Sequence, residues 1–305
     1  MKTLANTSRI RKVTFKSHGQ TLVGNLYLPK DYVEEQVLPG VIVTGSWTSI
    51  KEQMSGLYAK ELADRGFAAL AFDFRNFGES EGEVRTLESP KMKSEDIHAA
   101  AEFLATLPEI DRVGGMAICA SAGYMAQAIA QGAPLQSFAT VAAWLHDPET
   151  ARAIYTPEYY DRLMSVSQAA KTEYERNGTI RYTLAATNDE TVEFAAMCVA
   201  DPDFYYTNPD RGAIPEYDNR FPVMAWSEWL TFNAFSAAPG IHIPYLMLHG
   251  DGMMLPDNAK AFYEAIDAPK SLKWQDGLQM DYYDKPELVA SAATQIAEHF
   301  QKTLC

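Results

Sequence analysis

Short apolar runs alternate with longer stretches of helical periodicity along most of the chain. Continuous or alternating apolar runs predict strands, and apolar residues at every third or fourth position predict helices. The first two runs flank a glycine-containing turn at residues 17–20, which predicts an antiparallel hairpin at a sheet edge. Later strands and helices alternate, as is typical of parallel βαβ units, so the sequence indicates an α/β fold. Expected strands cover residues 13–15, 22–28, 40–44, 67–72, 112–118, 138–145, 245–249 and 271–274, and expected helices cover residues 52–65, 93–107, 124–129, 258–266 and 286–300.

Residues 148–243 interrupt this alternation with helical stretches broken by proline and glycine, and hold eight of the sixteen tyrosines. We expect a cap domain here, with residues 1–147 and 244–305 forming the core. Aromatic rings with a polar group offer a large contact area and a hydrogen bond. Tyr159, Tyr206 and Trp226 are therefore predicted to line a substrate pocket. The alternative for each ring is that it only packs the cap onto the core.

Composition excludes several classes of partner. With 305 residues, 47% of them apolar, the chain can bury a large core. Its formal net charge of −14 disfavours nucleic acid and anionic membranes. No apolar run suits a signal peptide or a membrane span, so a cytoplasmic location is expected. The three cysteines show no metal-ligand spacing, and no metal or cofactor is predicted; a homo-oligomer is left open.

Residues 116–125, MAICASAGYM, read as a buried strand that turns into a helix through small residues. In a nucleophile elbow, small residues two places before and after the nucleophile let strand and helix approach closely. Around Ser121 these places hold Cys119 and Gly123, so Ser121 is the predicted nucleophile. Two alternatives stay open. Ser121 could serve only as a helix N-cap, and Cys119, otherwise a pocket residue, satisfies the same spacing as a thiol nucleophile.

With these motifs in place, the chain resembles an α/β-hydrolase, in particular the capped dienelactone-hydrolase-like and polyketide-transferase-like group. The resemblance covers nearly the whole chain and rests on residues 45–48 (GSWT) with 51–54 (KEQM), 72–82 (FDFRNFGESEG), the elbow, 208–212 (NPDRG) and 282–284 (YYD). It implies a mostly parallel central sheet with helices on both faces and a helical cap inserted after the sixth strand. It also implies an oxyanion hole made by the backbone N–H of Ala122 and that of Ser46 or Trp47.

The base and acid that would activate the nucleophile, called the relay here, depart from the pattern of the resembled enzymes. In residues 277–284, GLQMDYYD, Gln279 stands where the resemblance implies the catalytic histidine. Glutamine has no titratable nitrogen and cannot act as a general base. The loop at residues 249–256 places Met253 at the usual acid position, so Asp251 is the expected substitute. His146, after the sixth strand, is the candidate replacement base.

The sequence therefore predicts a serine-dependent esterase, thioesterase, lactonase or acyltransferase with an atypical relay. Its expected substrate is a small-molecule ester, thioester or lactone with an apolar or aromatic acyl group. The alternative is a protein that keeps the fold and pocket but has lost hydrolysis, by divergence or by engineering at position 279, and binds a small molecule without turnover.

Overall fold

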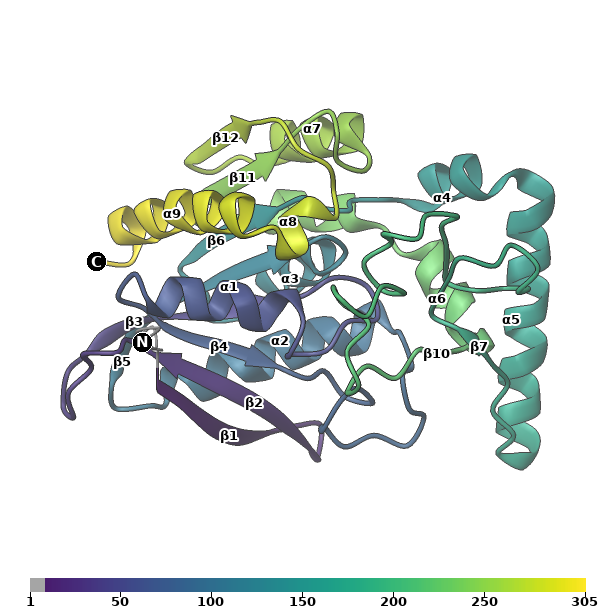
Figure 1. Ribbon diagram of the computed structural model, residues 1–305, viewed down its shortest axis with the longest axis horizontal. Coiled ribbons are helices and arrows are strands. Elements are labelled where there is room, and N and C mark those ends of the chain that lie inside the picture. The colour runs from purple at the N-terminus through teal and green to yellow at the C-terminus, as the bar shows by residue number, and fades with distance from the viewer. Residues whose placement is uncertain (1–8) are drawn as a thin grey trace.

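The computed structural model describes residues 9–305, so the first eight residues of the predicted core segment 1–147 lie outside it. A single eight-stranded sheet runs through the core in the order β1-β2-β4-β3-β5-β6-β11-β12 (Figure 1). The pairs β1–β2 and β2–β4 are antiparallel and all other pairs are parallel, which confirms the predicted α/β architecture. The strands are β1 Arg9–Ser17, β2 Gln20–Leu28, β3 Leu38–Thr44, β4 Ala68–Phe72, β5 Ile110–Ile118, β6 Ser137–Val141, β11 Tyr245–His249 and β12 Lys270–Trp274.

Helices cover the sheet from two sides. Helix α1 packs against α9, while α2 packs against α3 on the other face (Figure 1). In α2, the buried residues Ile97, Ala100, Ala101 and Leu104 recur at helical spacing, and the Ser89 side chain caps the first turn. The core helices are α1 Met54–Ala63, α2 Pro90–Ala105, α3 Ser121–Ala130, α7 Pro256–Ala265, α8 Asp281–Asp284 and α9 Pro286–Thr303.

The segment 148–243 lies between β6 and β11 in the chain and gathers mainly at one end of the molecule, at the right of Figure 1. It is part helix and part strand, whereas the sequence predicted a helical cap; its independence as a domain stays a prediction. Its elements are α4 Pro148–Tyr155, α5 Pro157–Asn177, β7 Tyr182–Leu184, β8 Ala186–Thr187, β9 Met197–Cys198, β10 Arg220–Pro222, η1 Val223–Ala225, α6 Trp226–Thr231 and η2 Ala234–Gly240.

One of the expected strands is shorter in the structure. The strand predicted over residues 138–145 ends at Val141, because Ala142 takes a positive φ of 47° and turns the chain toward the insertion. Among residues 9–305, no helix has both the length and the apolar character needed to cross a bilayer.

Candidate active site

The turn between β5 and α3 consists of only Cys119 and Ala120. Cys119 has a φ of 58°, an unusual backbone conformation for a residue with a side chain. Neighbouring segments hold it there: its N–H donates to Val141 O at 3.2 Å, and its carbonyl accepts from Trp144 N at 3.0 Å. Backbone strain of this kind persists where the surroundings enforce it, and it is common at functional sites.

The thiol of Cys119 is buried, with 7% of the residue exposed. Burial raises its pKa, although the N–H groups of Ala120 and Trp47, the Tyr283 hydroxyl and the Gln279 side chain all stabilise the thiolate. Among the hydrogen bonds within residues 9–305, neither of these two N–H groups has another acceptor. The site therefore presents a thiol beside two available backbone donors.

The hydroxyl of Ser121 points away from this thiol and into the sheet. It is fully buried, accepts from Thr44 Oγ1 at 2.9 Å and Ile118 N at 3.2 Å, and can donate to Thr44 O or Ile118 O. The N–H of Ala122 donates to Cys119 O at 3.1 Å, so it is already occupied. The sequence analysis expected the Ser121 hydroxyl as the nucleophile and the Ala122 N–H as an oxyanion donor, but in the structure both groups are taken up by hydrogen bonds within the protein. The small-residue spacing fits Cys119 two positions earlier, and this was the signal that pointed to the turn.

Gln279 and Tyr283 form the other wall of the site. The Gln279 side chain donates to Ala142 O at 2.6 Å and to Tyr283 Oη at 3.2 Å, and accepts from Met254 N at 3.0 Å. These bonds fix the amide next to the thiol, at the position where the resemblance implied a histidine. Tyr283, on α8, was not among the predicted site residues, although the motif at residues 282–284 had singled it out. Burial raises its pKa, so its hydroxyl keeps its proton.

The predicted relay residues lie elsewhere. In His146, Nδ1 accepts from Trp144 Nε1 at 3.0 Å and Nε2 donates to Trp229 O at 2.8 Å, while burial lowers its pKa. Both ring nitrogens of this neutral imidazole are thus occupied by hydrogen bonds within the protein. Asp251 is 79% exposed and pairs with Lys260 at 3.6 Å, so it faces solvent. All six histidines belong to the described residues, and none of them is among the groups that chiefly shift the pKa of the Cys119 thiol.

The predicted aromatic residues divide into two groups. Tyr206 lies at the site: its hydroxyl bonds the Ser46 hydroxyl and donates to Trp47 O at 3.3 Å. Trp226 packs edge-on against Trp47, with 5.7 Å between the ring centroids. Tyr159 is half-buried in the first turn of α5, with its hydroxyl near the Phe194 backbone. Ser46 and Tyr206 therefore support the loop that carries Trp47, and Tyr159 belongs to the insertion.

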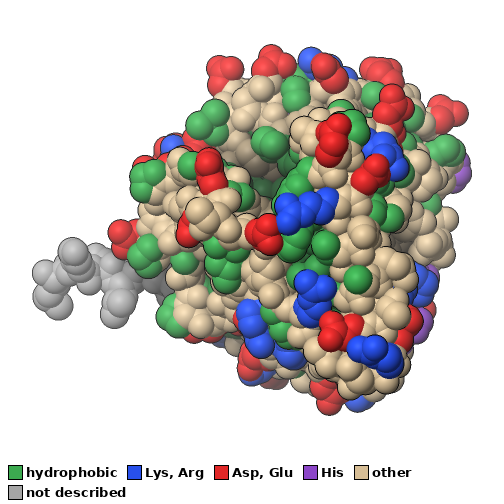
Figure 2. All heavy atoms as spheres, turned by 90° about the vertical axis from the view of Figure 1, so that its right-hand side faces the viewer, with side chains coloured by type: hydrophobic (Ala, Val, Ile, Leu, Met, Phe, Trp, Pro, Cys, Tyr) green, Lys and Arg blue, Asp and Glu red, His purple; other side chains and the backbone are tan. Residues whose placement is uncertain are grey.

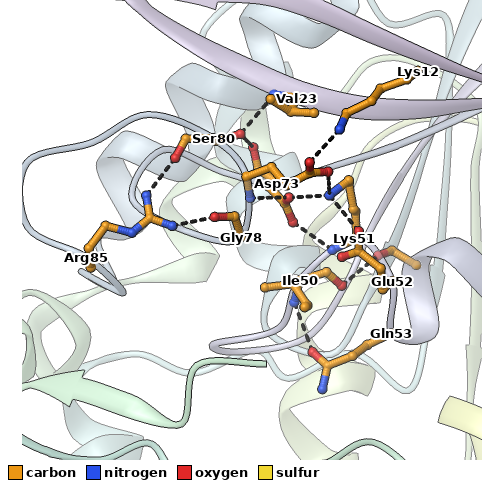
Figure 3. Close-up of polar contacts among 12 residues, drawn as sticks. Lys12, Val23, Ile50, Lys51, Glu52, Gln53, Asp73, Gly78, Ser80 and Arg85 are labelled. Carbon is orange, nitrogen blue, oxygen red and sulfur yellow. Dashed lines mark hydrogen bonds and ion pairs between the residues drawn. The ribbon is translucent and has the colours of Figure 1, made fainter. Parts of the chain in front are cut away.

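An ion cluster around the buried Lys51 and Asp73 side chains anchors the other end of that loop (Figure 3). The Lys51 ammonium lies 2.6 Å from Glu52, 2.7 Å from Asp73 and 2.8 Å from Glu79, filling the space between three carboxylates. Asp73 also accepts from Lys51 N and Glu79 N at 2.9 Å each. Hydrogen bonds from Lys12 and Lys51 lower the pKa of Glu79 to about 2. The cluster fixes the chain four residues after Trp47.

Replacing Lys51 by methionine is expected to reduce the free energy of unfolding by about 3–5 kcal/mol, because it leaves the buried Asp73 carboxylate uncompensated. Urea denaturation measures the change. Lys60→Met is the matched control, since Lys60 forms a partly exposed pair with Asp64 and should cost at most about 0.5 kcal/mol. Equal losses in the two variants would contradict the anchoring role.

Comparisons with known proteins support the same fold. No protein-family model matches the chain. It is 31% identical over 291 residues to the uncharacterized protein PA2218 of Pseudomonas aeruginosa, covering 90% of this chain and 76% of the relative. The crystal structure of that hypothetical protein superposes with a TM-score of 0.80, at 27% identity and with 99% and 95% coverage. The α/β-hydrolase GrgF from Penicillium shares the fold with a TM-score of 0.81 at 17% identity, covering 97% of this chain and all of that one.

The chain belongs to the same family as PA2218 and has the α/β-hydrolase fold, as its sheet order and these matches show. A shorter sequence match reaches the thiohydrolase aneE of Aspergillus aculeatus, with 34% identity over 93 residues, 30% of this chain and 28% of that relative.

Proposed function

We propose that this protein is a cysteine-dependent acyl-transfer enzyme that takes an acyl group from a thioester or activated ester onto Cys119. The observation that carries the proposal is the strained turn that presents the thiol beside the free N–H groups of Trp47 and Ala120. This is the arrangement of a nucleophile elbow with its oxyanion hole. Each such donor typically contributes about 10²–10³ in kcat.

The chemistry of the first step follows from the state of the thiol. Because burial raises its pKa, Cys119 enters the reaction as a thiol. Sγ forms a bond to the acyl carbon, the bond from that carbon to the leaving sulfur breaks, and the thiol proton passes to the departing sulfur. The carbonyl oxygen carries negative charge in the tetrahedral intermediate, where Trp47 and Ala120 donate to it. The product is an acyl thioester on Cys119.

The second step is expected to be slow with water. Gln279 and a protonated Tyr283 adjoin the thiol, and neither can remove a proton from water near neutral pH. An amine acceptor carries its own basic electron pair, so transfer to such an acceptor avoids the missing base. The rings of Trp47, Tyr206 and Tyr283 suit an apolar or aromatic acyl group. The similarity to a thiohydrolase also supports a thioester donor.

Binding without turnover is the second candidate function. It is favoured by one observation: both ring nitrogens of His146, the predicted base, are hydrogen-bonded to Trp144 and Trp229, and Gln279 lies beside the thiol instead. In that case the same pocket holds an acyl compound and leaves it intact. Bound ligand would raise the melting temperature, since it stabilises the native state.

Stopped-flow measurement of thiophenol release from S-phenyl thiobutyrate tests the proposal. The expected trace is a burst of about one equivalent of thiophenol per protein, followed by slow turnover, because acylation outruns hydrolysis. Addition of glycinamide should speed the slow phase by removing the acyl group to an amine. Absence of a burst, together with a higher melting temperature in the presence of the intact thioester, would instead establish the binding function.

A further inference from the structure

The site is closed in this structure. Cys119 is 7% exposed, and Trp47 and Tyr283 beside it are 5% and 1% exposed. Figure 2 looks onto the insertion end of the molecule, where apolar side chains mingle with acidic and basic ones. An acyl substrate can reach the thiol only if some part of this covering moves. Contacts between this covering and the rest of the protein keep the site closed.

Part of the covering is the segment 203–217 of the insertion, which we call the cover segment. It contains turns but neither helix nor strand, so it can move without breaking a regular element. It touches the loop after β3 at three points: Tyr206 Oη donates to Trp47 O, Gln53 Nε2 donates to Gly212 O at 2.7 Å, and Tyr217 Oη bonds Thr48 Oγ1 at 3.0 Å. These contacts place it directly over one wall of the site.

Arg211 ties the cover segment to the opposite wall. Its Nε lies 2.7 Å from Asp284 Oδ2, and its Nη2 lies 2.6 Å from Asp284 Oδ1 and 2.8 Å from Met280 O. Asp284 ends α8, the short helix that carries Tyr283. The rings of Tyr205 and Tyr283 also meet here, with centroids 5.2 Å apart. Arg211 thus spans the seam between the cover segment and the residues beside the thiol.

This pair has no equivalent elsewhere on the seam. Within residues 9–305, Arg211–Asp284 is the one ion pair that joins the insertion 148–243 to the core. The other ion pairs of the insertion, Arg152–Asp161, Arg162–Glu193 and Arg220–Asp218, are internal to it. The side chains of Arg211 and Asp284 are 18% and 24% exposed. This pair is therefore shielded enough from water to stabilise the closed form, yet exposed enough for salt to weaken it.

We propose that the Arg211–Asp284 pair is a latch that controls access to Cys119. With the pair formed, the cover segment seals the site; with the pair broken, the segment lifts and admits the acyl substrate. The relevance of the latch to catalysis rests on the proposed function. The access of reagents to the Cys119 thiol can be measured whether or not the protein is an enzyme. Loss of the pair is expected to raise the open population about tenfold, and high salt should raise it in the same direction.

Alkylation of the three cysteines by iodoacetamide, followed by peptide mass spectrometry, measures this access. Cys198 and Cys305 are exposed and serve as internal references in every sample. We expect Arg211→Gln and Asp284→Asn each to raise the alkylation rate of Cys119, relative to the references, by about tenfold. In the unaltered protein, 1 M sodium chloride should also accelerate Cys119, whereas it should have little effect on Cys119 in either variant.

Two controls separate latch opening from general loosening. Arg220→Gln removes the same type of side chain from an ion pair inside the insertion and should leave Cys119 unchanged. Phe300→Leu perturbs the core in α9, where the buried Phe300 ring packs against Phe67, and is compared after its loss of thermal stability has been measured. Unchanged Cys119 alkylation in either latch variant, or the same acceleration in Phe300→Leu at equal loss of stability, would overturn the proposal. Alkylation needs no acyl transfer, so a missing thiophenol burst with an intact latch result counts against the proposed function alone.

Discussion

Replacing Cys119 by alanine is expected to remove the thiophenol burst completely and to reduce steady turnover of S-phenyl thiobutyrate to the uncatalysed rate. The reason is that the thiol is the only reacting group in the proposed first step, so the N–H groups of Trp47 and Ala120 are left with no attacking atom to assist. Loss of a nucleophile can cost as much as about 10⁶ in kcat in well-evolved enzymes. Stopped-flow kinetics on the purified variant measures the loss.

Ser121→Ala is the matched control for that experiment. The Ser121 hydroxyl bonds Thr44 and Ile118 inside the sheet, so its removal should leave the burst intact. It should lower the free energy of unfolding by about 1–3 kcal/mol, since the Ile118 N–H loses an acceptor in a buried place. A burst that survives in Cys119→Ala and disappears in Ser121→Ala would reverse the roles assigned to the two residues.

Gln279→His is expected to raise the slow hydrolytic phase about 10²-fold. Gln279 contacts the thiol, so an imidazole in its place can act as the general base that the described site lacks, an effect usually worth about 10²–10⁴. The lower figure applies because Asp251, the predicted acid, is exposed and cannot orient the ring. The hydrolysis rate should rise with pH through the imidazole pKa, near or below about 6.5, since only the neutral ring accepts a proton.

Gln279→Asn provides the control, because it keeps an amide without adding a titratable nitrogen. It should not accelerate hydrolysis, and its rate should lack the pH dependence that histidine introduces. If Gln279→His leaves the slow phase unchanged while the burst remains, proton transfer from water does not limit turnover and the proposed second step is incorrect.

The fold was predictable because its signals are local and repeated. The apolar run at residues 40–44 is buried on both faces, as a central parallel strand must be, and β3 occupies that place between β4 and β5. The hairpin of β1 and β2 followed from its glycine-containing turn, where Gly19 has a φ of 84°. Each of these elements depends on neighbours in sequence, which a pattern of apolar positions records.

The position of the proposed nucleophile is harder to predict from sequence. The small-residue rule is met around Ser121 and also around Cys119, so spacing alone could not choose between them. What separates them in the structure is backbone conformation: Cys119 has a positive φ at the apex of the turn, while Ser121 opens α3 and turns its hydroxyl into the sheet. That difference depends on where β5 ends. The end of β5 coincides with the end of its pairing with β6, at Ile118 and Val141, and element boundaries are hard to predict from sequence.

The relay could not be located because it depended on the direction of loop side chains. His146 follows β6 as expected, but both of its ring nitrogens form hydrogen bonds, one to the Trp144 side chain and one to the Trp229 carbonyl. Tyr283 reaches the thiol from α8, far along the chain from the turn, and no local pattern links the two segments. Gln279 lies near Cys119 in the structure, in the segment 277–284 that the resemblance aligned with a known loop, and its part in catalysis stays a prediction.

The most direct test of the central claim, that Cys119 carries the acyl group, is peptide mass spectrometry of protein quenched in acid after mixing with S-phenyl thiobutyrate. The account predicts one butyryl group on the peptide that contains Cys119, removable by neutral hydroxylamine as a thioester is. A butyryl group on that peptide that resists hydroxylamine would be an oxygen ester on a residue other than Cys119 and would contradict the account. A butyryl group found only on Cys198 or Cys305 would contradict it as well.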